Sequence, residues 1–345
     1  MMKNMMLWIK FFIIPMLILI NIFSMFINNE LILWTMMEIN NMNFITLLIL
    51  KKKNFSMKKI LQSIFIYSIF QTLSSFMIMI HFIDYFHKFS ESFMIFEMGM
   101  LMKLGIFPFH SWTILIMKNM SWLIILILST FMKITPMMMI YISELSLYTN
   151  FIMIFSIILC SIWMMKQTKL KKIMAYSSII HSSWMMLIIF LNKFNWMFYF
   201  SIYLITITCI FSILWIHKIN ENKYLFSFNF MPLKFKFLFL ILLMSLMGMP
   251  PMSMMWTFLY TIKSLFKIFN YSTIIILILL MMSKLMMMIS YFYISFMFLF
   301  TKSFKMNYTF SYSNYWNKYK NYLFLIISLI TLLIFFSLYI WSSIY

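Results

Sequence analysis

The sequence predicts an all-α, polytopic membrane protein. Of its 345 residues, 64% are hydrophobic and only 10% are charged, and the mean hydropathy is +0.96. Apolar runs follow one another with little interruption, and a run of about 20 such residues is long enough to cross a bilayer as a helix. The runs are continuous rather than alternating, which argues against a transmembrane β-barrel. We therefore expect a helical bundle that forms a single transmembrane domain over residues 1–345.

We expect about eleven spans along the chain. The first is as long as a full span and no small-residue cleavage site follows it, so we interpret it as a retained helix and not as a signal peptide. Two predicted spans, 92–117 and 236–268, are too long for a simple helix and contain proline, which indicates a broken helix or a helix with a re-entrant piece. The predicted spans are 5–27, 31–50, 60–82, 92–117, 121–142, 148–165, 173–191, 194–216, 236–268, 272–300 and 321–343.

The loops between these spans differ in charge from one side of the membrane to the other. Loops on the side of the N-terminus contain most of the 27 basic residues, including the runs "KKKNFSMKK" (51–59) and "KQTKLKK" (166–172). The positive-inside rule makes this the inner side of the membrane, which in a mitochondrion is the matrix side, and eleven spans then put the C-terminus on the opposite, intermembrane side. Because the lysines orient the protein in this way, the net charge of +20 does not lead us to expect nucleic-acid binding.

The amino-acid usage indicates where the protein is encoded. Arginine and valine are absent, alanine occurs once, and methionine and phenylalanine account for 43 and 42 residues. Amino acids with G/C-rich codons are therefore scarce, and the excess of methionine suggests that ATA is read as methionine. This pattern is typical of an AT-rich animal mitochondrial genome, and we expect a multi-pass protein of the mitochondrial inner membrane.

Three ionisable residues lie inside predicted spans, where their side chains cannot easily reach an interface. They are Glu38, Lys103 and Lys133. A charged group at membrane depth is costly and is most often functional. A buried lysine can exchange its proton with a nearby carboxylate, so these residues are the parts of a proton relay. A structural role, in which the charges only hold helices together, is the alternative that the sequence leaves open.

Predicted helix breaks coincide with the two lysines. A proline inside a helix leaves the carbonyl four residues earlier without its donor, and both Pro108 and Pro136 follow a lysine by a few residues. Gly248, Pro250 and Pro251 mark a further predicted break. Free carbonyls at membrane depth require protein or water as partners, so we predict water near the lysines.

Other residues are weaker candidates. His181 lies within a predicted span among serines and could carry protons, although a histidine satisfied by neighbouring hydroxyls explains the same pattern. Lys284 is central in its apolar run. Cys160 and Cys209 form no C-x-x-C pair, so neither an iron–sulfur cluster nor a zinc site is predicted. The sequence has no glycine-rich phosphate loop, and we do not expect this chain to bind NADH or ATP.

Six stretches carry a family resemblance, and two of them, "KLGIFPFHSW" and "MAYSSIIHSSW", are quite specific. On these residues the chain resembles the NADH–ubiquinone oxidoreductase chain 2 family, the antiporter-like membrane subunits of mitochondrial respiratory complex I. The stretches occur in the family's order and cover about residues 30 to 260. They are "MEINNMNF" (37–44), "KKILQSIFIYSIFQTLSS" (58–75), "LMKLGIFPFHSW" (101–112), "SWLIILILSTFMKITPMMMIY" (121–141), "KKIMAYSSIIHSSWMM" (171–186) and "SLMGMPPMSMMW" (245–256).

The resemblance implies a proton-translocating subunit of an NADH:ubiquinone reductase that contains no redox centre itself. FMN, iron–sulfur clusters and ubiquinone would belong to other subunits, and this chain would hold neither a cofactor nor a metal. The implied partners are neighbouring antiporter-like and small membrane-arm subunits, together with lipids such as cardiolipin. Two alternatives remain, namely a stand-alone cation/proton antiporter and a non-pumping structural subunit.

The family's charged axis carries over to Glu38, Lys103 and Lys133. The glutamate would tune the first lysine, and the second lysine would pass protons along the middle of the membrane. The family usually has another lysine shortly after the double-proline break, and here the corresponding residue is Phe258. Lys263 and Lys284 are candidates to replace it, and we expect one of them to point into the protein interior.

Overall fold

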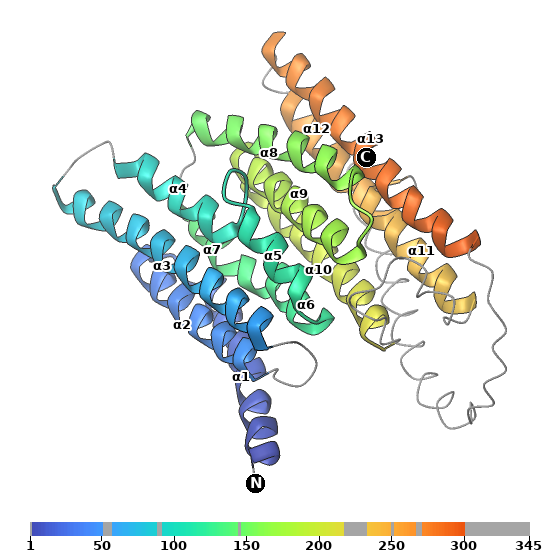
Figure 1. The fold of residues 1–345 in the computed structure, drawn as a ribbon. Helices are drawn as coiled ribbons and strands as arrows, with labels where there is room; N and C mark the ends of the chain where they lie inside the picture. Colours follow the sequence, from blue (N-terminus) through green and yellow to red (C-terminus); the bar gives the residue numbers. More distant parts are fainter. Residues whose placement is uncertain are drawn as a thin grey trace. The chain divides into compact units, whose positions relative to one another are not determined.

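The computed structural model describes residues 2–50, 57–87, 92–143, 146–216, 233–249, 252–266 and 271–300. Within these ranges every regular element is a helix (Figure 1). Seven helical segments there are long and apolar enough to cross a membrane. The all-α membrane class is thus confirmed, whereas the number of about eleven spans stays a prediction. The last predicted span, 321–343, lies outside the described residues.

The chain divides into two compact units, Met1–Lys193 and Phe194–Tyr345, and the prediction of one domain over the whole chain stays a prediction. The first unit contains α1 (Met2–Ser24), α2 (Glu30–Ile49), α3 (Met57–His87), α4 (Ser92–Leu104), α5 (Ser111–Asn119), α6 (Trp122–Ser129), α7 (Phe131–Ile142), α8 (Leu147–Met165) and α9 (Leu170–Leu191). The second unit contains α10 (Lys193–Ile216) from its second residue onward, with α11 (Leu233–Met247), α12 (Ser253–Phe266) and α13 (Tyr271–Phe300).

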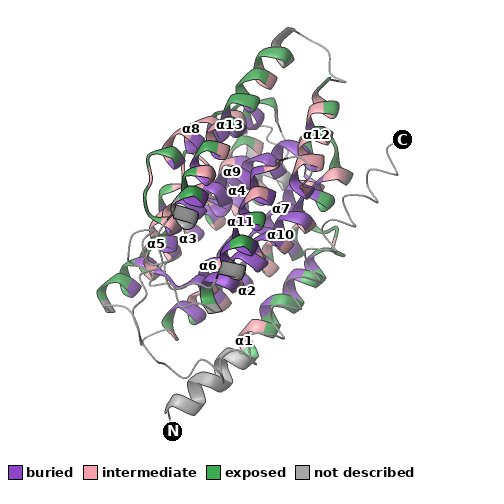
Figure 2. Ribbon diagram, turned by 90° about the vertical axis from the view of Figure 1, so that its right-hand side faces the viewer, coloured by how far each residue is buried: buried purple, intermediate pink, exposed green. Residues whose placement is uncertain are grey.

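The core of the first unit lies around α7 and α9. Helix α7 contacts α1, α2, α4 and α9, while α3 packs along α4 and α8 packs along α9. Nearly every side chain of α9 from Ile173 to Ile189 is buried, and Figure 2 shows the buried colour along much of α7 and α9. Helices α1, α2 and α3 each leave large apolar side chains exposed on their outer faces. Such a distribution suits helices that face lipid or another subunit.

The predicted span 92–117 is broken, but the break begins before its proline. Helix α4 ends at Leu104, and Gly105 adopts a positive φ of 65°. The N–H of Gly105 donates to the carbonyl of Met102 (3.2 Å) and the N–H of Ile106 donates to that of Leu101 (3.1 Å), which is the paired pattern of a glycine-terminated helix. Pro108 lies within this interruption, in the connection between α4 and α5, but the helix has already ended at Leu104. The prediction that Pro108 causes the break stays a prediction.

The predicted span 121–142 is also divided, and again not at its proline. Helices α6 and α7 meet at Thr130, whose φ is −118° and ψ −77°, and Pro136 lies inside α7. The hydroxyls of Ser129 and Thr130 both donate to the carbonyl of Leu126, at 3.0 and 2.7 Å. Hydroxyls that compete for a helix carbonyl bend helices, so the serine–threonine pair explains the break better than Pro136 does.

In the second unit, α11 ends in the same way as α4. Gly248 has a φ of 75°, its N–H donates to the carbonyl of Ser245 (3.1 Å), and the N–H of Met249 donates to that of Met244 (3.4 Å). Helix α12 begins at Ser253, and α11, α12 and α13 pack against one another. The predicted break in 236–268 is confirmed. The two prolines predicted to cause it, Pro250 and Pro251, lie outside the described residues.

Candidate functional site

Lys103 and Glu38 form an ion pair inside the first unit. Lys103 lies in the last turn of α4, just before the break at Gly105, and is 5% exposed. Its Nζ atom is 2.7 Å from Oε1 of Glu38 on α2, although the two residues are 65 positions apart. The glutamate is only partly buried, with 29% of its side chain exposed. The structure therefore brings together two of the three residues of the predicted axis.

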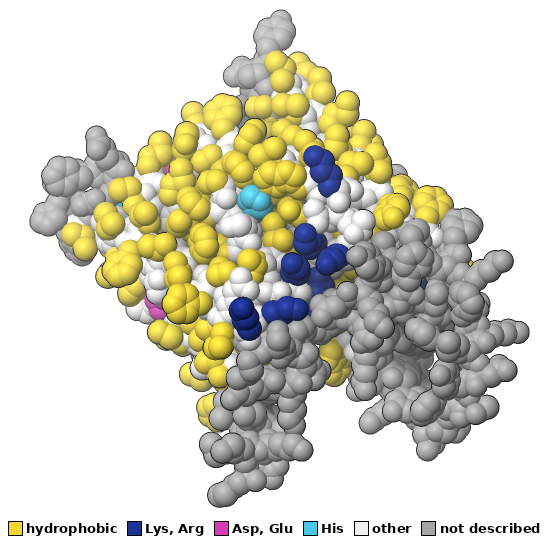
Figure 3. All heavy atoms as spheres, in the orientation of Figure 1, with side chains coloured by type: hydrophobic (Ala, Val, Ile, Leu, Met, Phe, Trp, Pro, Cys, Tyr) yellow, Lys and Arg dark blue, Asp and Glu magenta, His cyan; other side chains and the backbone are white. Residues whose placement is uncertain are grey.

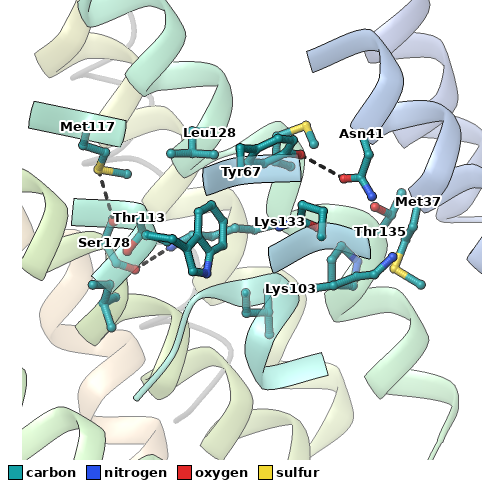
Figure 4. Close-up of a pocket in the computed structure, with 16 residues that line it drawn as sticks. Met37, Asn41, Tyr67, Lys103, Thr113, Met117, Leu128, Lys133, Thr135 and Ser178 are labelled. Carbon is teal, nitrogen blue, oxygen red and sulfur yellow. Dashed lines mark hydrogen bonds between the residues drawn. The ribbon is translucent and has the colours of Figure 1, made fainter. Parts of the chain in front are cut away.

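A hydrogen-bonded chain continues from the second oxygen of Glu38. The Nδ2 atom of Asn41 is 3.5 Å from Glu38 Oε2, and the hydroxyl of Tyr67 on α3 donates to Oδ1 of Asn41 at 2.9 Å (Figure 4). Thr35, three residues before the glutamate on α2, is exposed, and its hydroxyl donates to the carbonyl of Ile32 in its own helix. The polar neighbour of Glu38 on α2 is therefore Asn41.

Lys133 on α7 is as buried as Lys103 but has a neutral partner. It is 5% exposed, and its Nζ donates to the backbone carbonyl of Ser178 on α9 at 2.6 Å. The hydroxyls of Ser129 and Thr130, one turn earlier, do not reach it because they bond within α6 and its C-cap. Among the described residues, the ion pair of this region is the one between Lys103 and Glu38. Within those residues, no carboxylate lies within 4 Å of the ammonium group of Lys133.

The two lysines line the same small cavity. Figure 4 shows Lys103 on α4 extending toward the side of Met37 and Asn41, and Lys133 on α7 extending the opposite way toward Ser178, with the ring of Tyr67 above both. The space available to water centres is about 20 Å³, and one buried water needs roughly 10–15 Å³, so one or two waters fit. The polar side chains of the lining are Asn41, Tyr67, Gln71, Lys103, Trp112, Thr113, Lys133, Thr135 and Ser178.

The weaker candidates fall in different surroundings. His181 is fully buried in α9 and does not belong to the lining of this cavity. In the second unit, Lys284 on α13 is 7% exposed and its Nζ lies 5.3 Å from the ring centroid of Phe258 on α12. Lys263 on α12 is exposed. Of the two lysines considered near Phe258, Lys284 is the one that points inward. The functional roles of His181, Lys263 and Lys284 stay predictions.

Sequence reasoning missed the part that Glu97 plays. This residue of α4 is 1% exposed, and its carboxylate accepts from both the backbone N–H (2.5 Å) and the hydroxyl (2.6 Å) of Ser146. Ser146 is the N-cap of α8, so Glu97 completes a helix cap and is not a partner of Lys103. The serine before an apolar run is a recognisable start signal, but its acidic partner, 49 residues away, leaves no local trace.

The structure also records the surroundings of the cysteines and of possible metal ligands. Cys160 and Cys209 are buried and free. In the described ranges no group of three or more His, Cys, Asp or Glu side chains could hold a metal ion.

Comparison with known proteins places the chain in a family. The family model described as "NADH:quinone oxidoreductase/Mrp antiporter, TM" matches residues 28–286, which is most of the chain. The chain belongs to this family. The match includes both lysines that line the cavity, Glu38, and the helix breaks at Gly105 and Gly248, so all of these features lie within the family's shared region.

Relatives within the family confirm the resemblance found in the sequence. NADH-ubiquinone oxidoreductase chain 2 of Rhipicephalus sanguineus is 31% identical over 249 residues, which cover 72% of this chain and 75% of that protein. The corresponding protein of Anopheles gambiae is 33% identical over 183 residues, 51% of this chain and 53% of that one. The match thus spans about half the length of the Anopheles relative.

Solved structures share the fold at low sequence identity. A chain of respiratory complex I from Thermus thermophilus superposes with a TM-score of 0.73 at 16% identity, over 90% of this chain and 73% of that chain. A chain of the Mrp complex from Dietzia sp. superposes with a TM-score of 0.66 at 12% identity, over 76% of this chain and 55% of that chain. The antiporter-like helical architecture is therefore shared by this chain and by both complexes.

Proposed function

We propose that the chain is a proton-translocating membrane subunit of a respiratory NADH:ubiquinone reductase. The observation that carries this proposal is the joint position of two buried lysines, one of them paired with a glutamate, around one cavity with room for water. Electron transfer from NADH to ubiquinone, with its FMN and iron–sulfur clusters, takes place in other subunits. The partners are neighbouring antiporter-like and small membrane-arm subunits of the same complex.

In the proposed mechanism, protons move between side chains that already touch or are separated by water. The 2.7 Å contact allows Lys103 to hand a proton directly to Glu38. Water in the cavity that both lysines line would carry protons between Lys103 and Lys133. The lysine that loses its proton leaves the pair uncharged, and the attraction that held the pair in place disappears. A conformational or electrostatic change, driven by quinone reduction elsewhere in the complex, would change the proton affinity of Lys103 and so drive net movement of protons.

The test is Lys103→Met in the assembled complex of a genetically tractable relative. Methionine keeps most of the side-chain volume and removes the proton-carrying group, so we expect the number of protons translocated per NADH to fall. Lys118→Met is the matched control, because Lys118 is an exposed lysine at the end of α5 and its loss should leave that number unchanged.

Two other outcomes would identify the rival functions. A fully assembled Lys103→Met complex with normal proton translocation would favour a structural subunit whose charges only hold helices together. A chain that purifies alone, outside any NADH-oxidising assembly, would favour a stand-alone cation/proton antiporter, the function suggested by its likeness to the Mrp complex.

We further propose that the lysine-rich end of the first unit faces the mitochondrial matrix. Asn119, at the end of α5, donates to Ser63 near the start of α3 (3.3 Å), and Lys171 at the start of α9 donates to the carbonyl of Met120, so these helix ends lie together. Figure 3 shows lysine side chains gathered in this region. Its exposed lysines are Lys58, Lys59, Lys118, Lys166 and Lys169.

This orientation assigns the N-terminus to the matrix side of the inner membrane. The C-terminus, predicted to face the intermembrane space, lies outside the described residues. A cluster of lysines at the ends of membrane helices attracts anionic headgroups, so lipids such as cardiolipin are the partners we propose for this surface.

In the second unit, we propose that Lys284 takes the place of the family lysine whose position is occupied by Phe258. Its ammonium group lies over the ring of that phenylalanine, an arrangement that stabilises a cation in an apolar environment. Lys284 therefore reaches from α13 to the part of α12 where the missing lysine would stand. His181 remains a candidate for the polar path around Lys133, since it is buried one turn beyond Ser178 on α9.

A further inference from the structure

We propose that Tyr67 and Asn41 are positioning residues that hold the carboxylate of Glu38 toward Lys103. This inference rests on the proposed function and assigns roles to two residues outside the charged axis. Both residues line the cavity that contains the two lysines, and Asn41 lies three residues after Glu38 on the same helix.

The hydroxyl of Tyr67 determines which way the amide of Asn41 points. That hydroxyl donates to Oδ1 of Asn41 at 2.9 Å, so the oxygen of the amide must face α3 and its NH₂ group must face the other way. An amide has distinct donor and acceptor ends, and the donor end then approaches Oε2 of Glu38 at 3.5 Å. Without the tyrosine hydroxyl, the amide could turn its oxygen toward the carboxylate, where two acceptors would repel each other.

Tyr67 can fix this orientation because its own ring is immobilised. The residue is 1% exposed. Its ring centroid lies 4.9 Å from that of Phe44 on α2 and 5.8 Å from that of Trp112 on α5. A ring packed against two other rings has little freedom to rotate, so its hydroxyl is held at one place between α2 and α3.

The consequence concerns the site at which Glu38 receives a proton. Its Oε2 is directed to Asn41, and its Oε1 is in contact with the ammonium group of Lys103. When the proton moves, an N–H bond of Lys103 breaks and an O–H bond forms at Oε1 of Glu38, leaving a neutral amine and a neutral carboxylic acid. Tyr67 and Asn41 exchange no proton in this step; they keep Oε1 as the oxygen that faces the donor.

Few titratable groups face this carboxylate within the described residues. They are Lys103 from α4 and, through Asn41, Tyr67 from α3. Lys133 from α7 lines the same cavity, but its ammonium group donates to the carbonyl of Ser178. From α1, the neighbouring contact is uncharged, since Asn21 accepts from Asn40 of α2 at 3.2 Å. The proton equilibrium of Glu38 is therefore set by a small number of partners, and the loss of one hydrogen-bond donor should be measurable.

The experiment is a double-mutant cycle with Tyr67→Phe and Asn41→Leu in the assembled complex of a relative that carries the same four residues. Tyr67→Phe keeps the packed ring and removes only the hydroxyl. We expect the rate of NADH-driven proton translocation to fall by about two- to tenfold, the range to which the loss of one hydrogen bond corresponds, and the pH profile of translocation to be displaced. Ser74→Ala is the matched control, because it removes a buried hydroxyl of α3 that bonds only within its own helix to Gln71.

The cycle separates positioning from simple helix packing. If Tyr67 acts through Asn41, then Tyr67→Phe has no further effect once Asn41→Leu is present, whereas independent packing effects add. Additive effects, or a single Tyr67→Phe variant with parental rate and pH profile, would overturn the inference. The proposed function would survive that result as long as Lys103→Met lowers translocation, so the two failures can be told apart.

Discussion

Lys103 and Lys133 are buried to the same degree, yet they are stabilised differently. Lys103 is compensated directly by Glu38 at 2.7 Å, while Lys133 donates to the neutral carbonyl of Ser178. Removing one member of a buried ion pair leaves the other unpaired, at a cost of about 3–5 kcal/mol. Because desolvation offsets the attraction when such a pair forms, the cost of breaking the pair is not a measure of its net stabilisation. A small change in charge nevertheless has a large effect at this place, which suits a site that must switch.

At the level of single residues, the second unit supplies a matched pair of lysines. Lys284 is buried over Phe258, and Lys263 on the neighbouring helix is exposed. We expect Lys284→Met to reduce NADH-driven proton translocation and Lys263→Met to leave it near the parental value. Proton uptake by vesicles that contain each assembled variant complex measures the difference; equal effects of the two substitutions would exclude the proposed relay role of Lys284.

The two interrupted helices end in the same local structure, despite unrelated sequences around them. In both α4 and α11 a glycine with positive φ follows the helix, and the last carbonyls accept from the two following N–H groups. The surroundings differ, since Gly105 is packed against Thr113 and Trp112, whereas around Gly248 the nearest atoms to an added Cβ lie 3.6 Å away.

That difference predicts that the same substitution, glycine to alanine, lowers the free energy of unfolding by different amounts at the two positions. Gly248→Ala should cost about 1–2 kcal/mol, because an L-residue is strained in the left-handed region. Gly105→Ala should cost about 1–3 kcal/mol more, because its Cβ would collide with the methyl group of Thr113 in a filled space. Thermal unfolding of the purified complexes tests the order of the two variants, and a Gly105→Ala complex as stable as Gly248→Ala would show that the α4–α5 connection can expand.

Taken together, the first unit has a small polar-lined cavity within a largely apolar core, apolar outer faces and one lysine-rich end. The cavity with Lys103 and Lys133 is lined by residues of α2, α3, α4, α5, α6, α7 and α9, while large exposed apolar side chains lie on α1, α2 and α3. This arrangement buries Lys103 and Lys133 and gathers exposed lysines at one end of the unit.

The orientation can be measured with a membrane-impermeant amine reagent. We expect Lys166 and Lys169, exposed between α8 and α9, to react in inside-out vesicles of the inner membrane and to be protected in mitoplasts. Lys103 is the internal control, since its burial should protect it in both preparations. Labelling of the two exposed lysines from the intermembrane side would reverse the proposed topology.

The sequence by itself determined the class of the protein and most helix positions, and it singled out three ionisable residues within predicted spans. Long apolar runs are a local property, and so is a charge within one, which is why Glu38, Lys103 and Lys133 stand out without any structure. The break in 92–117 was foreseen for a similar reason, since proline and glycine interrupt an otherwise continuous pattern.

Only the tertiary structure decided where the helices break and which side chains meet. The break points lie at Gly105 and Thr130 and not at the nearby prolines, because backbone conformation and hydroxyl bonds to Leu126 end the helices first. Tyr67 meets Asn41 across 26 residues and Glu97 meets Ser146 across 49. Such pairings depend on how each helix is rotated about its axis against its neighbours, and hydropathy along one chain carries no information about that rotation.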